Sequence, residues 1–249
     1  MVKESPPIAD TLRFLLLQVR NDDDPIRGQE IVCFVRSLSC RREQLSVFDL
    51  LASAPSSEIL QDADIVLLGG SGDYSVATGG PWLPPALAAL RLLYDIGKPT
   101  FASCWGFQAM AKALGGRVIT DPSRAELGSI EVHLTAEGEA DSLFSQLGSP
   151  FLAQMGHQDR VDRLPQSATR LAGSKRVENQ AFCFAGKPIY CTQFHPELNR
   201  AALLDRLAAY PWYVEQISGM SFEAFAATCK DTPETDSLLK KFVAQVRGQ

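Results

Sequence analysis

Short apolar runs alternate with helical patterns through the first half of the chain. Residues 12–19 (LRFLLLQV) are almost continuously apolar, as a strand must be when both faces of its sheet are covered. Residues 29–39 then place their apolar side chains on one face of a helix. This order is typical of an α/β fold, with a mainly parallel sheet and helices on both of its faces. The same alternation predicts strands at 45–50, 64–68 and 100–103 and helices at 84–96 and 106–114.

The second half of the chain has a different pattern. Between residues 118 and 192 it is richer in short strand-forming runs, which predict an antiparallel extension of the sheet. We expect a single domain at 11–249, with C-terminal helices from about residue 199, and an N-terminal tail at 1–10. The predicted strands are at 129–134, 151–155, 181–184 and 189–193, and the predicted helices at 201–210 and 237–246.

The composition is that of an ordinary globular protein, with 249 residues, 45% of them hydrophobic and 21% charged. Its formal net charge of -5 argues against a nucleic-acid binder, which usually carries a basic patch. No apolar stretch approaches the ~20 residues that span a bilayer, and the N-terminal residues lack a cleavable signal pattern. We therefore expect a cytoplasmic protein that binds neither nucleic acid nor membrane.

The six cysteines show neither a CxxC pair nor the spacing of a zinc finger. In a reducing compartment they are expected to be free thiols, and we expect no metal site and no cofactor. Three consecutive aspartates at 22–24 are expected to form a solvated turn rather than a cation site. The thiols expected to serve only packing or the surface are Cys33, Cys40, Cys183, Cys191 and Cys229.

Cys104 stands between the strand predicted at 100–103 and the helix predicted at 106–114. A sharp strand-to-helix turn lifts a nucleophile above the carboxyl end of a sheet, where open α/β folds bind ligands. Such a turn needs small residues on both sides, and Ala102 and Gly106 meet that need. The helix that follows adds free N–H groups and a positive dipole, which lower the pKa of a thiol. The alternative is a cysteine buried between a strand and a helix only for packing.

His195 and Glu197 form a second candidate pair, in the segment QFHPE. Extended residues two apart project to the same side, so the carboxylate can orient the imidazole while the ring serves Cys104. This is the nucleophile, base and orienter arrangement of a thiol hydrolase. Alternatively, the histidine caps the C-terminal helix and the glutamate is a first-turn acid.

A GGSG loop at 69–72 follows the strand predicted at 64–68. Glycines let the backbone turn so that amide N–H groups converge on an oxyanion. Alone, such a loop is more often an ordinary turn.

The three motifs become specific through their order along the chain: GGSG at 69–72, SCWGFQ at 103–108 and QFHPE at 193–197. In this order the chain resembles the class I glutamine amidotransferases, and within them the stand-alone branch that is similar to the amidotransferase domain of GMP synthase. The resemblance extends from about residue 12 to residue 197. It implies a flavodoxin-like three-layer sandwich and a Cys-His-Glu triad.

The resemblance implies a role for each matching position. Cys104 is the expected nucleophile, which forms a γ-glutamyl thioester. His195 is the expected general base and then acid, oriented by Glu197. The family's oxyanion hole uses two backbone N–H groups, which match Gly70 and Trp105.

A further segment at 155–161 (MGHQDRV) resembles the family's SHxDxV stretch, in which His157 is expected to be architectural. Two departures concern the nucleophile motif, where Ala102 replaces a glycine and Phe107 replaces a histidine. Neither change removes a catalytic group. The substrate-binding positions carried over from the family are Gly72, Gln108, Gln158 and Asp159.

Together these positions predict a glutamine amidotransferase that hydrolyses the γ-amide of glutamine. The residues after Glu197 read as helices and no GxxxxGK[ST] loop is present, so ammonia is expected to pass to a synthetase on a separate protein. One alternative is a stand-alone hydrolase of γ-glutamyl amides or peptides. A second is a non-catalytic binding or regulatory module, which would need none of the three triad residues.

Overall fold

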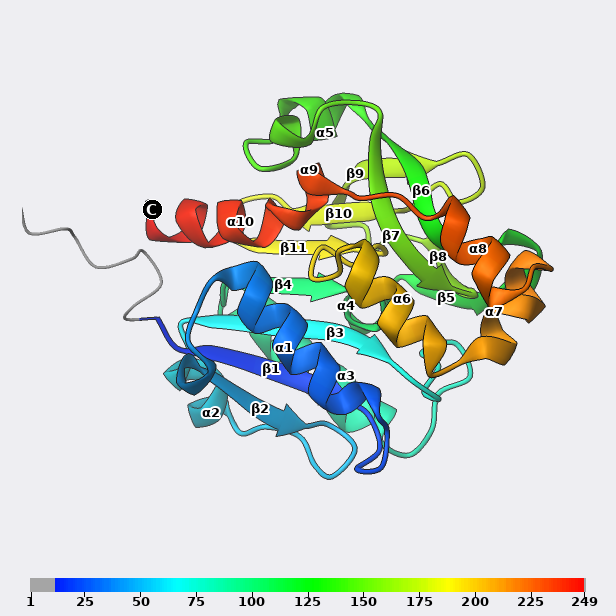
Figure 1. Ribbon diagram of the computed structural model, residues 1–249. Helices are drawn as coiled ribbons and strands as arrows, with labels where there is room; N and C mark the ends of the chain where they lie inside the picture. The colour runs from blue at the N-terminus through cyan, green and yellow to red at the C-terminus, as the bar shows by residue number, and fades with distance from the viewer. Residues whose placement is uncertain (1–11, 249) are drawn as a thin grey trace, which may run out of the picture.

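A nine-stranded sheet runs through the protein and carries helices on both faces (Figure 1). The structure is a computed structural model that describes residues 12–248, so the tail predicted at 1–10 lies outside it. Neighbouring strands are parallel from β2 to β11 and antiparallel from β11 to β7, which confirms the predicted sheet with its antiparallel extension. The order is β2 (Leu45–Asp49), β1 (Phe14–Val19), β3 (Ile65–Ser71), β4 (Thr100–Ser103), β11 (Ile189–Thr192), β10 (Ala181–Phe184), β9 (Ala168–Ser174), β6 (Glu126–Leu134) and β7 (Phe151–His157).

The inner strands of the parallel half are buried along almost their whole length. Every residue of β1 and of β4 is buried, and only the last residue of β3 is partly exposed. Helices cover both faces of these strands, so apolar side chains are needed at every position rather than at every second one.

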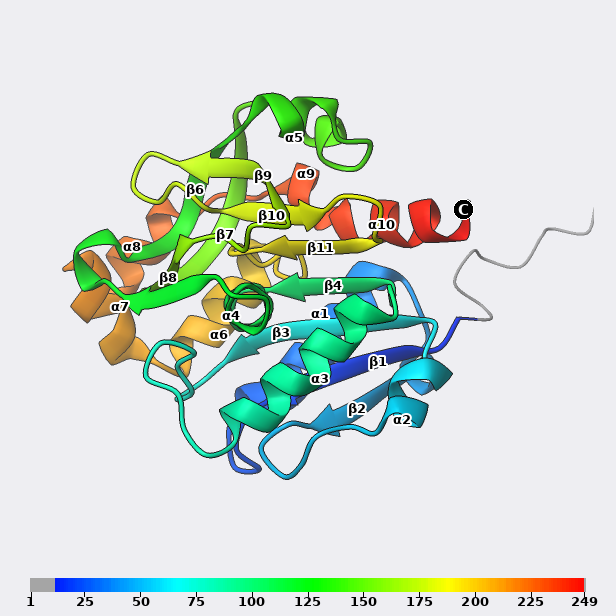
Figure 2. The same ribbon diagram turned by 180° about the vertical axis from the view of Figure 1, so that it is seen from behind.

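A layer of helices packs against each face of the sheet, and each layer forms a separate apolar core with it. Leu90, Phe107 and Met110 belong to one core, and Phe34 and Phe242 to the other. The predicted three-layer arrangement is therefore confirmed. The layer in front of the sheet in Figure 1 contains α1 (Ile26–Leu38), α6 (Arg200–Ala208) and α10 (Leu238–Arg247), and the layer seen in Figure 2 contains α3 (Leu83–Asp95) and α4 (Trp105–Ala113).

Shorter elements complete the chain. β5 (Arg117–Thr120) pairs with β8 (Asp159–Arg163) in a two-stranded antiparallel sheet that packs against α4. Within residues 12–248, no helix combines the length and the apolar character that crossing a membrane requires. The remaining helices are α2 (Ser57–Asp62), α5 (Ala136–Ala140), α7 (Pro211–Ser218), α8 (Phe222–Thr228) and α9 (Pro233–Asp236), with short 3-10 turns at Arg42–Gln44, Pro122–Arg124 and Phe144–Leu147.

The carboxyl ends of β3, β4 and β11 lie side by side, because β4 pairs in parallel with both of the others. Open α/β sheets bind ligands at this edge. The predicted loop is instead the end of a strand: β3 contains Gly69, Gly70 and Ser71 of the GGSG motif. Cys104 follows β4, and the QFHPE segment follows β11. The topology alone therefore brings the three sequence motifs to one place.

Candidate active site

Cys104 occupies a sharp turn between β4 and α4. Its backbone has φ 52° and ψ -104°, a left-handed conformation that non-glycine residues rarely adopt. Strain of this kind persists where the surrounding structure enforces it, and it is concentrated at functional sites. The Cys104 N–H donates to Thr192 O at 2.8 Å, which ties the turn to β11.

The turn depends on small neighbours, as its sequence predicts. A Cβ atom on Gly106 would lie 2.5 Å from Leu68 Cβ and 3.2 Å from Ala102 Cβ, so helix and sheet leave no room for a side chain. The departure at Phe107 has a structural explanation. That side chain is fully buried, with its ring 5.0 Å from the ring of Phe182, and it belongs to the apolar core rather than to the site.

His195 and Glu197 form a tight buried pair. His195 Nδ1 lies 2.6 Å from Glu197 Oε1, and the two side chains are 5% and 0% exposed. The other carboxylate oxygen accepts a hydrogen bond from Ser103 Oγ at 3.1 Å. Arg206 from α6 adds a positive charge, with Nη1 3.8 Å from Glu197 Oε1. The carboxylate is thus held from three sides, and the ring is held by the carboxylate.

Electrostatics favour an imidazolium beside the thiol. Burial lowers the pKa of His195, but the charges of Glu197 and Cys104 and hydrogen bonding to both outweigh it and raise the pKa to about 9. For Glu197 burial acts in the opposite direction and raises the pKa, but the attraction of His195 and Arg206 lowers it overall. The ring can therefore carry a proton near neutral pH next to the Cys104 sulfur.

The two expected oxyanion donors differ in their surroundings. Trp105 is the first residue of α4, so its N–H has no acceptor within the helix. Gly70 lies against the imidazole, since a Cβ atom there would be 3.1 Å from His195 Cε1. Its N–H, however, donates to Glu30 Oε1 at 3.1 Å. Gly70 thus lies beside His195, but its N–H already donates a hydrogen bond to Glu30.

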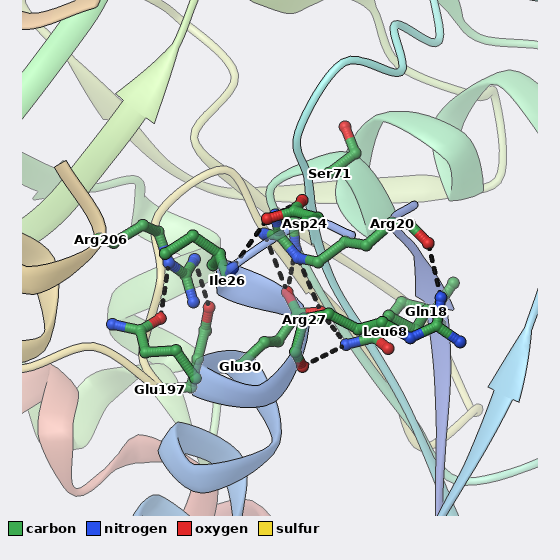
Figure 3. A network of polar contacts seen from close by, with 12 residues as sticks. Gln18, Arg20, Asp24, Ile26, Arg27, Glu30, Leu68, Ser71, Glu197 and Arg206 are labelled. Carbon is green, nitrogen blue, oxygen red and sulfur yellow. Dashed lines mark hydrogen bonds and ion pairs between the residues drawn. The ribbon is translucent and has the colours of Figure 1, made fainter. Parts of the chain in front are cut away.

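Glu30 belongs to a buried polar network that the sequence did not reveal (Figure 3). Its carboxylate accepts from Gln18 Nε2 at 2.9 Å and from Arg20 Nε at 3.2 Å. Arg20 also pairs with Asp24 at 2.9 Å, and Tyr210 Oη donates to Asp24 at 2.8 Å. The prediction of a solvated turn at 22–24 is wrong for Asp24, whose side chain is only 8% exposed because it compensates the buried arginine.

A chamber of about 430 Å³ opens beside Cys104. Asp159 lies in its wall and accepts hydrogen bonds from Ser75 Oγ and Thr120 Oγ1, both at 2.6 Å. Gln108 Nε2 donates to the Asp159 main-chain oxygen at 2.9 Å. All four predicted substrate-binding positions line this chamber: Gly72, Gln108, Gln158 and Asp159.

A smaller chamber, of about 140 Å³, also borders Cys104 and has His195 in its wall. Its remaining wall comes largely from the C-terminal helices, which the sequence motifs did not implicate. Trp212 and Tyr213 of α7 border both chambers. The sequence signal for them is the aromatic cluster at 210–213 (YPWY), which no motif search would single out. The other lining residues of this chamber include Arg20, Leu198, Leu203, Arg206, Leu207 and Tyr210.

His157 serves the scaffold. Its Nε2 lies 3.2 Å from Glu126 Oε2 and its Nδ1 lies 3.0 Å from Asp159 O, in a site that is 3% exposed. The other cysteines are free thiols in buried or half-buried places, and burial raises the pKa of Cys33 to about 11. Between residues 12 and 248, no group of three or more His, Cys, Asp or Glu side chains could hold a metal ion.

Solved structures with this fold include amidotransferases. A glutamine amidotransferase from Thermotoga maritima has a TM-score of 0.74 at 20% identity, covering 96% of this chain and 99% of the other. A glutamine amidotransferase from Methylobacillus flagellatus has a TM-score of 0.69 at 17% identity, covering 94% of this chain and 95% of the other. At these identities the likeness concerns the fold.

Sequence relatives include two kinds of GMP synthase chain. The glutamine-hydrolyzing GMP synthase of Wolinella succinogenes is 33% identical over 127 residues, which are 49% of this chain and 24% of that relative. The shorter relative is the A subunit of the glutamine-hydrolyzing GMP synthase of Sulfurisphaera tokodaii, 34% identical over 141 residues, 57% of this chain and 71% of the relative. The chain thus spans about a quarter of the length of the first curated relatives it matches.

The match to a family as a whole is more extensive. The glutamine amidotransferase class-I family matches residues 32–203, a range that contains all three motifs. The chain is also similar to GMP synthases, which are among its sequence relatives. The chain therefore belongs to the class-I glutamine amidotransferase family.

Proposed function

We propose that this chain hydrolyses the γ-amide of glutamine with Cys104 as nucleophile, His195 as proton carrier and Glu197 as orienter. The observation that carries the proposal is the strained Cys104 turn beside the His195–Glu197 pair, whose Nδ1–Oε1 distance is 2.6 Å. Such a constellation suits acyl transfer by a thiolate, because a positioned imidazole serves both halves of the reaction.

In the first half-reaction the Cys104 thiolate attacks the γ-carbonyl carbon of glutamine. His195 gives its proton to the amide nitrogen, the C–N bond breaks, and ammonia leaves while the glutamyl group stays on the sulfur as a thioester. In the second half, His195 takes a proton from water, and the resulting hydroxide adds to the thioester carbon. The C–S bond then breaks, which releases glutamate and restores the thiolate and imidazolium.

The oxyanion that forms in each half needs donors. The Trp105 N–H is available at the start of α4. The Gly70 N–H could join it only after it exchanges its hydrogen bond to Glu30. For the substrate's amino acid end, Gly72, Gln108, Gln158 and Asp159 are the proposed contacts, and the Asp159 carboxylate suits an α-ammonium group.

The proposed destination of the ammonia is a separate synthetase. This rests on the relatives whose names describe a GMP synthase or its A subunit, and on the small share of the former that the chain covers. A chain that supplies ammonia to a partner is expected to hydrolyse glutamine faster when that partner is bound.

A second candidate function is a hydrolase of γ-glutamyl amides or peptides that acts without a partner. The smaller chamber favours it, because release of ammonia alone needs no such space beside His195.

The test compares purified wild type with the Cys104→Ala variant, and with Cys40→Ser as a matched thiol control at a half-buried position. We expect glutamate release from glutamine by the wild type and by Cys40→Ser, and none by Cys104→Ala. A chloro-ketone analogue of glutamine should label Cys104 only. If neither turnover nor labelling occurs with glutamine or γ-glutamyl amides, the chain is a non-catalytic module.

A further inference from the structure

We propose that the smaller chamber is a leaving-group subsite, which takes a small apolar or aromatic substituent on the nitrogen of a γ-glutamyl amide. The inference rests on the proposed function, since it identifies the substrate class of that same site. It extends to residues of α6 and α7 to which no role has yet been given.

The two chambers meet at Cys104 and divide the substrate between them. Gly72, Cys104 and Gly156 border both, whereas His195 lines the smaller chamber and not the larger one. The leaving nitrogen must face His195, because it takes its proton from that ring. A group attached to the nitrogen therefore points into the smaller chamber, while the glutamyl part occupies the larger.

The volume of the smaller chamber limits the substituent. At about 140 Å³ it compares with the cavity of ~150 Å³ that binds benzene in an engineered protein core. It accommodates one six-membered ring or a short alkyl chain. Two fused rings would fill almost all of this volume, so we expect them to fit less well.

The chemistry of the wall favours an apolar group. Three leucines contribute to it, and each is buried: Leu198, Leu203 and Leu207. Trp212 and Tyr213 add aromatic side chains to the walls of both chambers. Burial of apolar area at such a wall supplies roughly 25 cal/mol per Å² of binding free energy.

Both arginines in the wall are paired with carboxylates. Arg20 is held by Glu30 and Asp24. Arg206 donates to Gln29 Oε1 at 3.1 Å and approaches Glu197, while its buried Nη2 has no hydrogen-bond partner among the described residues. A carboxylate on the leaving group would thus meet cations whose charge is already compensated, next to Asp73.

The experiment measures glutamate release by the wild type from glutamine, γ-glutamyl anilide and γ-glutamyl 1-naphthylamide. We expect turnover of glutamine and anilide, and a kcat/KM for the naphthylamide at least tenfold below that for the anilide. Equal kcat/KM values for the two arylamides, or glutamine turnover without any anilide turnover, would overturn the inference. Failure of all three substrates would instead overturn the proposed function.

A variant that fills the smaller chamber with a larger side chain provides a second test. Leu203→Phe should lower kcat/KM for the anilide at least tenfold more than it lowers kcat/KM for glutamine. The matched control is Ala208→Phe, an exposed position of the same helix, which should keep the wild-type ratio of the two substrates. A folded Leu203→Phe protein with that unchanged ratio would contradict the proposal, and the arylamide comparison decides it if the variant does not fold.

Discussion

Ser103 precedes the proposed nucleophile in the sequence and contacts the proposed orienting carboxylate in the fold. Its Oγ lies 3.1 Å from Glu197 Oε2 and 3.2 Å from Leu68 O, in a fully buried position. The hydroxyl therefore links the β4 turn to the segment after β11. It fixes the carboxylate through the oxygen that the imidazole does not contact.

Replacing Ser103 with alanine should loosen that carboxylate without removing any reacting group. A buried hydrogen bond contributes about 1 kcal/mol, so we expect kcat for glutamine to fall roughly fivefold with KM little changed. Steady-state kinetics beside Ser123→Ala, an exposed serine, will check this. A loss as large as that of Cys104→Ala would mean that Ser103 does more than position Glu197.

The raised pKa of His195 predicts a pH dependence of stability. A folded-state pKa of about 9, above the ordinary value of 6.5, means that the protonated ring stabilises the fold fully below pH 6.5. This contribution should disappear as pH rises through 9. Urea unfolding of wild type and His195→Asn should therefore give free energies of unfolding that converge between pH 6.5 and 10. A gap that widens with pH would contradict the imidazolium assignment.

At the residue scale, the sequence singled out Cys104, His195 and Glu197 as candidates because each lies in a short contiguous motif. It did not reveal Arg20, which meets Asp24 and Glu30 through contacts that apolar periodicity does not encode. Arg206 was missed for a related reason: its partners Gln29 and Glu197 come from other elements.

At the scale of helices and strands, the sequence predicted some elements with their correct bounds, misplaced the start of one helix and missed one strand. β4 and β10 have the bounds predicted from sequence: β4 lies between Pro99 and Cys104, and β10 is an uninterrupted apolar run after Gln180. Helix α1 begins at Ile26 rather than at 29, because Pro25 and Asp24 start it before its apolar face becomes regular. The strand β9 was missed, since its half-buried sequence ATRLAGS mixes Thr, Arg and Gly and gives no apolar run.

Glu30 joins α1 to the end of β1 by compensating a buried guanidinium. Glu30→Ala would leave Arg20, 2% exposed, with only Asp24 as an anionic partner. Breaking a buried ion pair in this way costs about 3–5 kcal/mol, which should appear in the free energy of unfolding. Glu43→Ala, at an exposed position, should change it by less than ~0.5 kcal/mol. Equal effects would show that the network adds nothing to stability.

Two glycines in helices should respond oppositely to alanine. At Gly106 the new Cβ would lie 2.5 Å from Leu68 Cβ, so α4 must move away from β3, at a cost of about 1–3 kcal/mol. At Gly28 of α1 nothing lies within 4 Å, and alanine should stabilise by roughly 0.5–1 kcal/mol. Thermal unfolding of the two variants measures the change in stability of each. If both changes had the same sign, they would contradict the packing described.

On the scale of the whole molecule, the site joins segments from both ends of the chain. The family match ends at residue 203, yet α7 lies beyond it and supplies Trp212 and Tyr213 to both chambers. The C-terminal residues also close the apolar core, where the Phe242 ring lies 5.4 Å from Phe101 and 5.9 Å from Tyr190. The sequence predicted α10 from its amphipathic pattern but could not show which surface it covers.

Removing the Phe242 ring should destabilise the whole fold. Truncation of a fully buried phenylalanine to alanine costs about 3–5 kcal/mol, because it leaves a cavity as well as losing apolar burial. Chemical unfolding of Phe242→Ala should show this, with Lys240→Ala at an exposed position of α10 as control. A loss below ~1 kcal/mol would mean that α10 docks only loosely on the sheet.

The hydrogen bond from the Gly70 N–H to Glu30 has a consequence for the rate of the proposed reaction. One amide proton cannot serve two acceptors at full strength, and absence of one such donor slows acyl transfer by about 100- to 1,000-fold. On the proposed mechanism, the protein therefore hydrolyses glutamine slowly while this hydrogen bond is in place. On the same mechanism, opening of the contact between Glu30 and Gly70 frees this N–H for the oxyanion and raises the rate of hydrolysis.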